Sequence, residues 1–422
     1  MSKAHHAPRF ERRRFLALAG ATAISGCLPV SPTTDGESAR APSAPRTGAW
    51  IPDAELLAEL PGLMRLASVP GLSIAVVERG DVAWVRSLGV LSASTQQPVR
   101  DDTLFEAASM SKPVFAYGVL QLVEQQRLDL DRPLVTYHRP SYLPSDPRID
   151  HMTARHVLSH TSGLPNWGDD AKPETLRPAF DPGARFRYSG EGFFWLQLVV
   201  ERITGLGLDA FMRTTLFEPA GMRHSAFAWD ESLLPAVSFG HRDGEPVAGH
   251  GTRPVMDLII PRAQRWGKPV RDWLHEDWLR VAAELDPANP ARRVRFVNAA
   301  GSLLTTATDY ARFLGFVVKH TPRAAWELTE PTRTAMLSPQ VAVRPDDPLW
   351  WGLGWTIERS GAGWRCGHEG NNENLFTSYA GADPTRGRAL VILTNAAGGF
   401  GLYQRIVRRL TGYDQLSFIA TV

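Results

Sequence analysis

Short runs rich in β-branched and aromatic residues stand near the two ends of the chain. Residues 72–77 and 82–85 are two such runs, and the four residues between them are polar or glycine, which is the pattern of a β-hairpin. Three further runs, bounded by glycines and charged residues, follow at 352–357, 375–379 and 389–394. The pattern therefore predicts strands at both ends of the sequence.

Helical patterns fill most of the sequence between these strands. A loop after residue 104 leads into a long, largely apolar segment that ends near residue 126. Because proline is tolerated only in the first turn of a helix, Pro113 indicates that this helix begins at or just before Ser109. Further helices are predicted at 52–60, after a capping Thr153, and at 191–204, 272–285 and 401–410.

Strands at both ends with helices between them indicate one sheet that is built from distant segments. Residues 51–127 and 298–422 would supply the sheet domain, and residues 128–297 would form a mainly helical domain inserted into it. Within the insertion, the tryptophan-bearing segment 244–297 is a candidate lid or cleft wall. The expected fold class is therefore α/β (α+β).

The first 27 residues have the pattern of an export signal. Arginines at 12–14 precede an apolar run at 15–23 that is too short to span a bilayer, which is a twin-arginine arrangement. The run ends in Ile-Ser-Gly-Cys27, which resembles a bacterial lipobox, where the cysteine is acylated after cleavage. Residues 28–50, rich in proline, serine, threonine and alanine, then form a flexible tether. We therefore expect a periplasmic lipoprotein, with Leu28 favouring the outer membrane; an ordinary cleaved signal with an incidental cysteine is the alternative.

Composition and charge remove several classes of function. The chain has 422 residues, of which 43% are hydrophobic and 21% are charged, as in an ordinary globular protein. Its formal charge of +2 gives no reason to expect a nucleic-acid partner. The two cysteines, Cys27 and Cys366, lie in different contexts, so we predict neither a disulfide nor a zinc site. Leu279 stands where a metalloprotease helix starting at His275 would need its second histidine, and the lack of Gly-x-Ser-x-Gly excludes an α/β-hydrolase.

Ser109-Met110-Ser111-Lys112 is the main candidate for chemistry. Residues at i and i+3 share one face of a helix, so the Lys112 amine can sit against the Ser109 hydroxyl and accept its proton. Ser-x-x-Lys is the nucleophile signature of penicillin-recognising serine enzymes. Because this spacing also arises by chance, the surrounding motifs decide its meaning.

Motifs on both sides of Ser109 carry a family resemblance. In chain order they are Pro70-Gly71, Leu158-Ser159-His160-Thr161-Ser162-Gly163-Leu164, Pro182-Gly183, Phe186-Arg187-Tyr188-Ser189, Glu201-Arg202-Ile203-Thr204-Gly205, Pro219-Ala220-Gly221-Met222, Ala300-Gly301-Ser302-Leu303-Leu304-Thr305-Thr306, Gly352-Leu353-Gly354 and Gly367-His368-Glu369-Gly370. With them, the chain resembles the serine β-lactamase and penicillin-binding superfamily from about residue 70 to residue 411, on the branch of class C β-lactamases, D,D-carboxypeptidases and family VIII carboxylesterases. The resemblance implies an antiparallel sheet flanked by helices, with an inserted, mainly helical domain.

The resemblance also implies the parts of an active site. Ser109 is the nucleophile, Lys112 and Tyr188 are the general bases, and the backbone N–H groups of Ser109 and Asn371 form the oxyanion hole. No metal or organic cofactor is required. The turn at His160 invites a catalytic-triad interpretation, but in this family the turn is structural, so we assign His160 to the scaffold.

Two departures from the family pattern bear on the substrate, and the first is at Gly190. The family's Tyr-x-Asn is Tyr188-Ser189-Gly190 here, which removes an amide that can hydrogen-bond the acyl amide of a peptide or a β-lactam. Such a loss costs about 1 to 3 kcal/mol, or roughly tenfold to a hundredfold in rate if the bond acts in the transition state. We therefore expect weak turnover of amides and β-lactams.

The second departure is His368-Glu369-Gly370 in place of Lys-Thr-Gly, all three being predicted to face the substrate. A histidine is cationic only below its usual pKa of about 6.5 unless that pKa is shifted, and we expect Glu369 to neutralise it. A substrate with a carboxylate then lacks the electrostatic attraction to a positive side chain, whereas the binding of a neutral ester is little affected. In the alternative, Glu369 points away into solvent. Three tryptophans either line an apolar acyl pocket or belong to the core: Trp167, Trp350 and Trp351.

The sequence therefore favours an exported serine hydrolase that cleaves esters. A weak class C-like β-lactamase or a D,D-carboxypeptidase is the first alternative. The other alternative is a penicillin-binding or muropeptide-sensing protein that binds or is acylated without hydrolysing its ligand. Gly190 and Glu369 leave this alternative open. The expected partner is a small ester, a β-lactam or a peptidoglycan peptide, with no nucleic acid and with membrane contact only through the lipid anchor.

Overall fold

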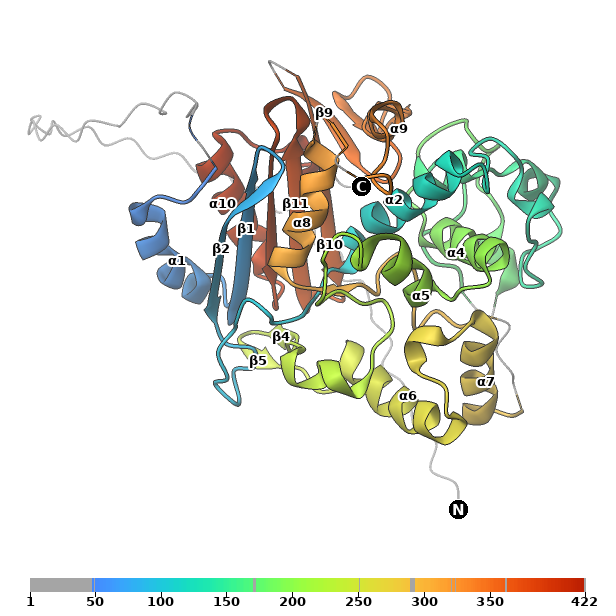
Figure 1. Cartoon of the computed structure of the whole chain (residues 1–422), viewed down its shortest axis with the longest axis horizontal. Coiled ribbons are helices and arrows are strands. Elements are labelled where there is room, and N and C mark those ends of the chain that lie inside the picture. Colours follow the sequence, from blue (N-terminus) through green and yellow to red (C-terminus); the bar gives the residue numbers. More distant parts are fainter. Residues whose placement is uncertain are drawn as a thin grey trace, which may run out of the picture. The chain divides into compact units, whose positions relative to one another are not determined.

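Strands from both ends of the chain form one eight-stranded antiparallel sheet in the computed structural model (Figure 1). The structure describes residues 48, 50–169, 172–249, 251–288, 293–319, 321–322, 324–360 and 363–420. Across the sheet, the order is β2 (Asp81–Gly89), β1 (Gly71–Glu78), β12 (Arg388–Thr394), β11 (Phe376–Asp383), β10 (Gly363–Asn372), β9 (Thr356–Ser360), β8 (Leu349–Trp351) and β7 (Val341–Ala342). Leu72 lies opposite Thr394, so an early strand and the last strand are direct neighbours.

Helices and short strand pairs make up most of the remaining regular structure. The helices are α1 (Ala54–Leu66), α2 (Ser111–Glu124), α3 (Ala154–Leu158), α4 (Gly190–Thr204), α5 (Leu208–Met212), α6 (Thr252–Trp266), α7 (His275–Leu285), α8 (Ala307–Val318), α9 (Glu330–Met336) and α10 (Gly399–Thr411). The short pairs join β3 (Phe105–Glu106) to β6 (Leu304–Thr305) and β4 (His241–Arg242) to β5 (Glu245–Pro246).

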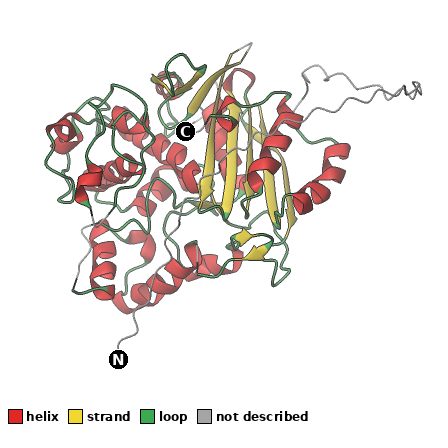
Figure 2. Cartoon of the chain, turned by 180° about the vertical axis from the view of Figure 1, so that it is seen from behind, coloured by secondary structure: helices red, strands yellow, loops and turns green. Residues whose placement is uncertain are grey.

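Helices cover both faces of the sheet. On one face, Leu60 of α1 and Ile406 of α10 pack in one apolar cluster with Ile74 of β1. On the other face, α8 packs against β1 and β12, and it lies in front of the sheet in Figure 1 and behind it in Figure 2. Because both faces are covered, β1 and β12 consist of nearly continuous buried residues. Each buried leucine or isoleucine contributes about 1.5–3 kcal/mol to this packing.

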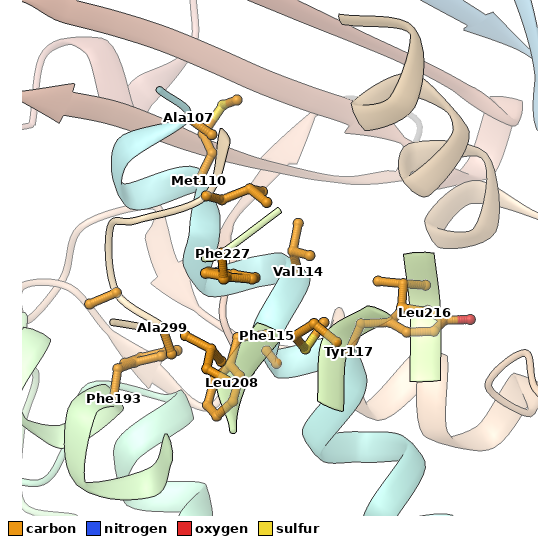
Figure 3. Packing of buried hydrophobic residues seen from close by; sticks show 14 of the residues in the cluster. Ala107, Met110, Val114, Phe115, Tyr117, Phe193, Leu208, Leu216, Phe227 and Ala299 are labelled. Atoms are coloured by element: carbon orange, nitrogen blue, oxygen red, sulfur yellow. The ribbon is translucent and has the colours of Figure 1, made fainter. Parts of the chain in front are cut away.

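The α2 helix is the central element of the helical region. Its residues from Ser111 to Leu122 are all buried, so the helix is surrounded by protein on every side. Figure 3 shows the side chain of Phe115 among those of Phe193 from α4 and Leu208 from α5, with which it shares one apolar cluster. This packing fixes the amino-terminal end of α2, which carries Lys112 and directly follows the turn with Ser109, between the sheet and the helical region.

The structure confirms the predicted fold class and corrects one predicted strand. Residues 352–357 do not form a continuous strand, because β8 ends at Trp351 and β9 begins at Thr356. Gly354 between them has a φ of +91°, and the Gly352 N–H donates to the Trp355 carbonyl at 2.8 Å. This left-handed conformation suits glycine, so the two glycines mark a tight turn. The strand β10 and the helices α6, α8 and α9 were not among the predicted elements.

Some of the sequence-based predictions fall outside the described residues. These are the export signal, the lipidation site Cys27 and the tether as far as residue 47. The division into a sheet domain and a helical domain stays a prediction, because the described residues from 48 onward pack as one compact unit. In the described part of the chain, no helix has the length and apolar character that crossing a membrane requires.

Candidate active site

Ser109 lies in a tight turn, Ala108–Met110, that leads directly into α2. Ala108 has a φ of +50°, which is uncommon for a residue with a side chain and marks a strained backbone. Buried hydrogen bonds hold the turn in place: Ser111 Oγ donates to the Ala108 carbonyl at 2.6 Å, and Tyr310 donates to the Met110 carbonyl at 3.0 Å. A 3₁₀ turn thus begins just before Ser109, as predicted, but the α-helix itself begins two residues later, at Ser111.

The Lys112 amine lies against the Ser109 hydroxyl. Lys112 Nζ is 3.1 Å from Ser109 Oγ, and it donates to the Ala300 carbonyl at 2.8 Å. The side chain is 1% exposed, and its Nζ lies 4.6 Å from the ring centre of Tyr188. Burial lowers the pKa of Lys112 well below its usual value, which favours the neutral amine. A neutral amine can accept the Ser109 proton.

The carbonyl of Ala300 is a part of the site that the sequence interpretation did not assign. Its position is fixed by the preceding turn, where the Ala300 N–H donates to Asn298 Oδ1 at 3.0 Å and the Asn298 N–H donates to Ser302 Oγ at 2.9 Å. Ala300 and Ser302 belong to one of the motifs that carried the family resemblance. The motif was visible, but its contact with Lys112, 188 residues away in the chain, was not.

Tyr188 completes the group around Ser109. Burial raises the pKa of Tyr188 above its usual value, and its interaction with the Ser109 side chain opposes part of that rise. The ring of His160 lies beneath it, with ring centres 4.2 Å apart, and Trp351 meets Tyr188 edge-on at 5.7 Å. His160 is fully buried and accepts a hydrogen bond from the Ser189 N–H at its Nδ1, 3.0 Å away. Its contacts are those of a scaffold residue that positions Tyr188.

His368 and Glu369 do not form the neutralising pair that the sequence led us to expect. The His368 ring meets the ring of Trp351 edge-on, and its Nδ1–H donates to the Glu369 carbonyl at 2.7 Å. Burial lowers the pKa of His368 to about 3, so the imidazole is neutral at ordinary pH. The Glu369 carboxylate instead accepts a hydrogen bond from the Tyr403 hydroxyl at 2.7 Å. The alternative in which Glu369 points into solvent is also wrong.

Gly190 and Gly370 are both places where another part of the chain comes too close for a side chain. A Cβ at Gly190 would lie 2.6 Å from the Trp167 ring, and a Cβ at Gly370 would lie 2.3 Å from the Ala107 carbonyl oxygen. The first contact explains why no amide can project from position 190. The second lets β10 pass directly over the turn that carries Ser109. Packing alone therefore requires glycine at position 370, independently of any contact between Gly370 and a substrate.

A cleft of about 590 Å³ opens beside Ser109. Its lining comes from the Ser109 turn, the loop before α4, strands β8 to β10, helix α10 and the segment that follows α10. The predicted residues among them are Ser109, Tyr188, Trp351, His368, Glu369, Gly370 and Asn371. Of the three tryptophans, Trp350 lies outside this lining and packs edge-on against Trp364. The structure therefore brings most of the predicted site residues to one cleft.

A second cleft of about 560 Å³ shares Asn371 with the first. Trp167 lies in this second lining and is 42% exposed. The segment proposed as a lid or cleft wall contributes Thr252 and Val255 from α6, and also Arg295. Glu106 ties this wall to β10, because its carboxylate accepts hydrogen bonds from the Thr252 N–H and from the Asn372 side chain. Part of the segment is thus a wall next to the candidate site.

Comparison with known proteins adds the following relatives. The protein-family model described as Beta-lactamase matches residues 59–414. Penicillin-binding protein 4 of Amycolatopsis lactamdurans is 27% identical over 82% of this chain and 85% of that protein. Esterase EstB of Burkholderia gladioli is 32% identical over 47% of this chain, so the chain spans about half the esterase, 56% of its length. A solved structure described as a class C beta-lactamase has the same fold, with a TM-score of 0.63 and 19% identity over 85% of this chain and 97% of that one.

Proposed function

The chain belongs to the beta-lactamase family of serine hydrolases, and from that premise we propose that it cleaves neutral esters through an acyl-enzyme on Ser109. The observation that carries this proposal is the contact between Ser109 and Lys112. A serine hydroxyl is a weak nucleophile until a base removes its proton, and a buried lysine with a lowered pKa is such a base. Esterase EstB and lovastatin esterase are named as esterases among the relatives, which supports the ester class.

The proposed reaction has two steps. In the first, Ser109 Oγ attacks the ester carbonyl carbon while its proton passes to Lys112 Nζ, and the negative charge on the carbonyl oxygen is stabilised by the backbone N–H groups of Ser109 and Asn371. The alcohol leaves with a proton that Lys112 and Tyr188 return. In the second, a water molecule gives its proton to the same pair, attacks the acyl-enzyme and releases the carboxylic acid and free Ser109.

The preference for a neutral ester rests on two features of the cleft. The neutral imidazole of His368 offers no permanent positive charge to a substrate carboxylate. Gly190 offers no amide to a peptide or β-lactam, because the Trp167 ring occupies the space that a side chain would need. A substrate without a carboxylate and without an acyl amide needs neither of these groups. Its binding and its transition state are therefore weakened least by their absence.

A second candidate function is D,D-carboxypeptidase or weak β-lactamase activity. The observation that favours it is the relative described as penicillin-binding protein 4, which matches 82% of the chain. Acylation by penicillin without release would instead indicate a sensor. Export to the periplasm with an acylated Cys27 would bring either activity next to peptidoglycan, and mass spectrometry of the mature protein tests that acylation.

One experiment separates these functions. The protein and its Ser109→Ala variant are assayed with p-nitrophenyl butyrate, a chromogenic cephalosporin and a D-Ala-D-Ala peptide. We expect ester hydrolysis to be fastest and to disappear in Ser109→Ala, while Ser94→Ala, at an exposed serine in the loop after β2, keeps full activity. Ester hydrolysis that survives in Ser109→Ala overturns the nucleophile, and faster peptide or cephalosporin cleavage overturns the ester preference.

A further inference from the structure

Asn166 lies beside Gly190, and its side-chain amide has a fixed orientation. The Gly190 N–H donates to Asn166 Oδ1 at 3.1 Å and to the Asn166 carbonyl at 3.0 Å, and the Glu191 N–H donates to the same carbonyl at 3.0 Å. A backbone N–H can only donate, so the oxygen of the Asn166 amide faces Gly190. Its nitrogen, Nδ2, must therefore point the other way.

The loop that carries Asn166 is held at several points. Glu191 Oε1 accepts a hydrogen bond from the Gly168 N–H at 2.9 Å and forms an ion pair with Arg295 at 2.7 Å. Ser189 Oγ donates to the Pro165 carbonyl at 2.8 Å. Glu191 and Ser189 are themselves buried. Asn166 therefore lies on a fixed loop. Less conformational entropy of the loop is then lost when a ligand binds.

The Asn166 side chain faces the Ser109 cleft. The residue is exposed and lines the same cleft as Ser109 and Tyr188. Within the described part of the chain, the only hydrogen bond of its side chain is the one that Oδ1 accepts from Gly190. Nδ2 thus carries two N–H donors without a partner among the described residues, on a residue that lines the cleft. An amide held by its oxygen with its nitrogen turned toward a cleft can donate to an oxygen atom of a ligand.

We propose that Asn166 determines substrate specificity by donating a hydrogen bond from Nδ2 to an oxygen atom that the substrate carries outside the scissile carbonyl. The preferred substrates are then esters with a second carbonyl oxygen in the acyl or the alcohol part. Gly190 cannot supply such a donor, since its Cβ position is blocked by Trp167, whereas its own N–H orients the Asn166 amide that does. This inference rests on the proposed ester hydrolysis at Ser109.

Two substrate pairs test the inference, and within each pair the esters differ in one carbonyl. p-Nitrophenyl levulinate and p-nitrophenyl pentanoate differ in the acyl part, and 4-acetylphenyl butyrate and 4-ethylphenyl butyrate differ in the alcohol part. In Asn166→Asp, the carboxylate still accepts from the Gly190 N–H but has no donor. In this variant we expect kcat/KM to fall more for the ester with the extra carbonyl than for its hydrocarbon partner, in one of the two pairs. The difference should be about threefold to tenfold, as expected for the loss of one hydrogen bond.

Asn166→Leu and Thr175→Val complete the test. Asn166→Leu removes the donor without adding a charge, and it should give the same selective loss. Thr175→Val removes the hydrogen bond from the Asp169 N–H, 2.8 Å long, on the outer side of the loop and should leave the ratio within each pair unchanged. An equal change for both members of both pairs in the Asn166 variants overturns the inference while ester hydrolysis stands. If the wild-type protein hydrolyses no ester, both proposals fail.

Discussion

The Tyr403 hydroxyl of α10 donates a hydrogen bond to the Glu369 carboxylate of β10, and this contact directs Glu369 away from His368. Neighbouring residues in a strand point to opposite faces, so the two side chains serve different surroundings. The His368 ring lies with Tyr188 and Trp351, while the Glu369 carboxylate lies with Tyr403 of α10. The Glu369 carboxylate therefore pairs with Tyr403 and does not neutralise His368.

Glu369→Gln should stabilise the protein at pH 8 and have little effect at pH 4. Burial raises the pKa of Glu369 in the folded protein, so its contribution to stability is fully present below the unfolded pKa and is lost as pH rises through the folded pKa. Gln still accepts from Tyr403 but never ionises, so at pH 8 the variant should keep the stability that the wild type loses when Glu369 ionises. Urea unfolding at both pH values measures this difference.

Tyr403→Phe is the matched control for that prediction. It removes the hydrogen bond and leaves the carboxylate unpaired, so it should destabilise the protein more at pH 8 than at pH 4. A Glu369→Gln variant that is less stable than the wild type at pH 8 contradicts the role assigned to this contact.

His368→Asn should reduce the loss of stability in acid. Because burial lowers the pKa of His368 to about 3, the unfolded chain binds a proton below about pH 6.5 that the folded protein does not bind until about pH 3. Stability should therefore fall as pH decreases across this window, by at most about 1.4 kcal/mol per pH unit for this group. Asn can still donate to the Glu369 carbonyl and does not titrate. Equal losses between pH 8 and pH 5 in both proteins would contradict a neutral, buried His368.

Local sequence patterns predicted those parts of the fold and site that depend on near neighbours. Strands β1, β11 and β12 follow from runs of β-branched and aromatic residues, and the meeting of Ser109 with Lys112 follows from a spacing of three residues at the start of a helix. The strand β10 was missed because its glycines, charges and paired asparagines lack an alternating apolar pattern.

The features that were wrong or missing depend on contacts between distant residues. The direction of Glu369 is set by Tyr403, 34 residues later in the chain, and the space at Gly190 is set by Trp167 on another loop. The second partner of Lys112 is a backbone carbonyl, which has no signature in the identity of Ala300. Such contacts exist only once the sheet and the helical region have come together, so residue patterns alone do not reveal them.

The pH dependence of ester hydrolysis should show a lysine with a lowered pKa. The neutral amine of Lys112 is the active form, so kcat/KM should rise with pH and level off well below 10.5, the usual pKa of a lysine. Lys112→Met should lower kcat/KM by roughly 10²- to 10⁴-fold, the usual contribution of a general base. A profile whose midpoint lies near that usual value, after correction for spontaneous hydrolysis, would contradict a buried neutral amine.

Gly190→Asn alone should not create a better amide or β-lactam hydrolase. The new Cβ would lie 2.6 Å from the Trp167 ring and 2.8 Å from the Asn166 carbonyl oxygen, and such overpacking costs about 1–3 kcal/mol. Trp167→Ala removes the first of these contacts, and because the indole is 42% exposed, this change alone should cost little. The double variant should therefore be more stable than Gly190→Asn, and its introduced amide should raise cephalosporin hydrolysis about tenfold above that of Trp167→Ala, as expected for one new hydrogen bond. Thermal unfolding and cephalosporin assays on all four proteins of this cycle measure both effects. Additive losses of stability in the double variant would show that the Trp167 ring is not what keeps a side chain out of position 190.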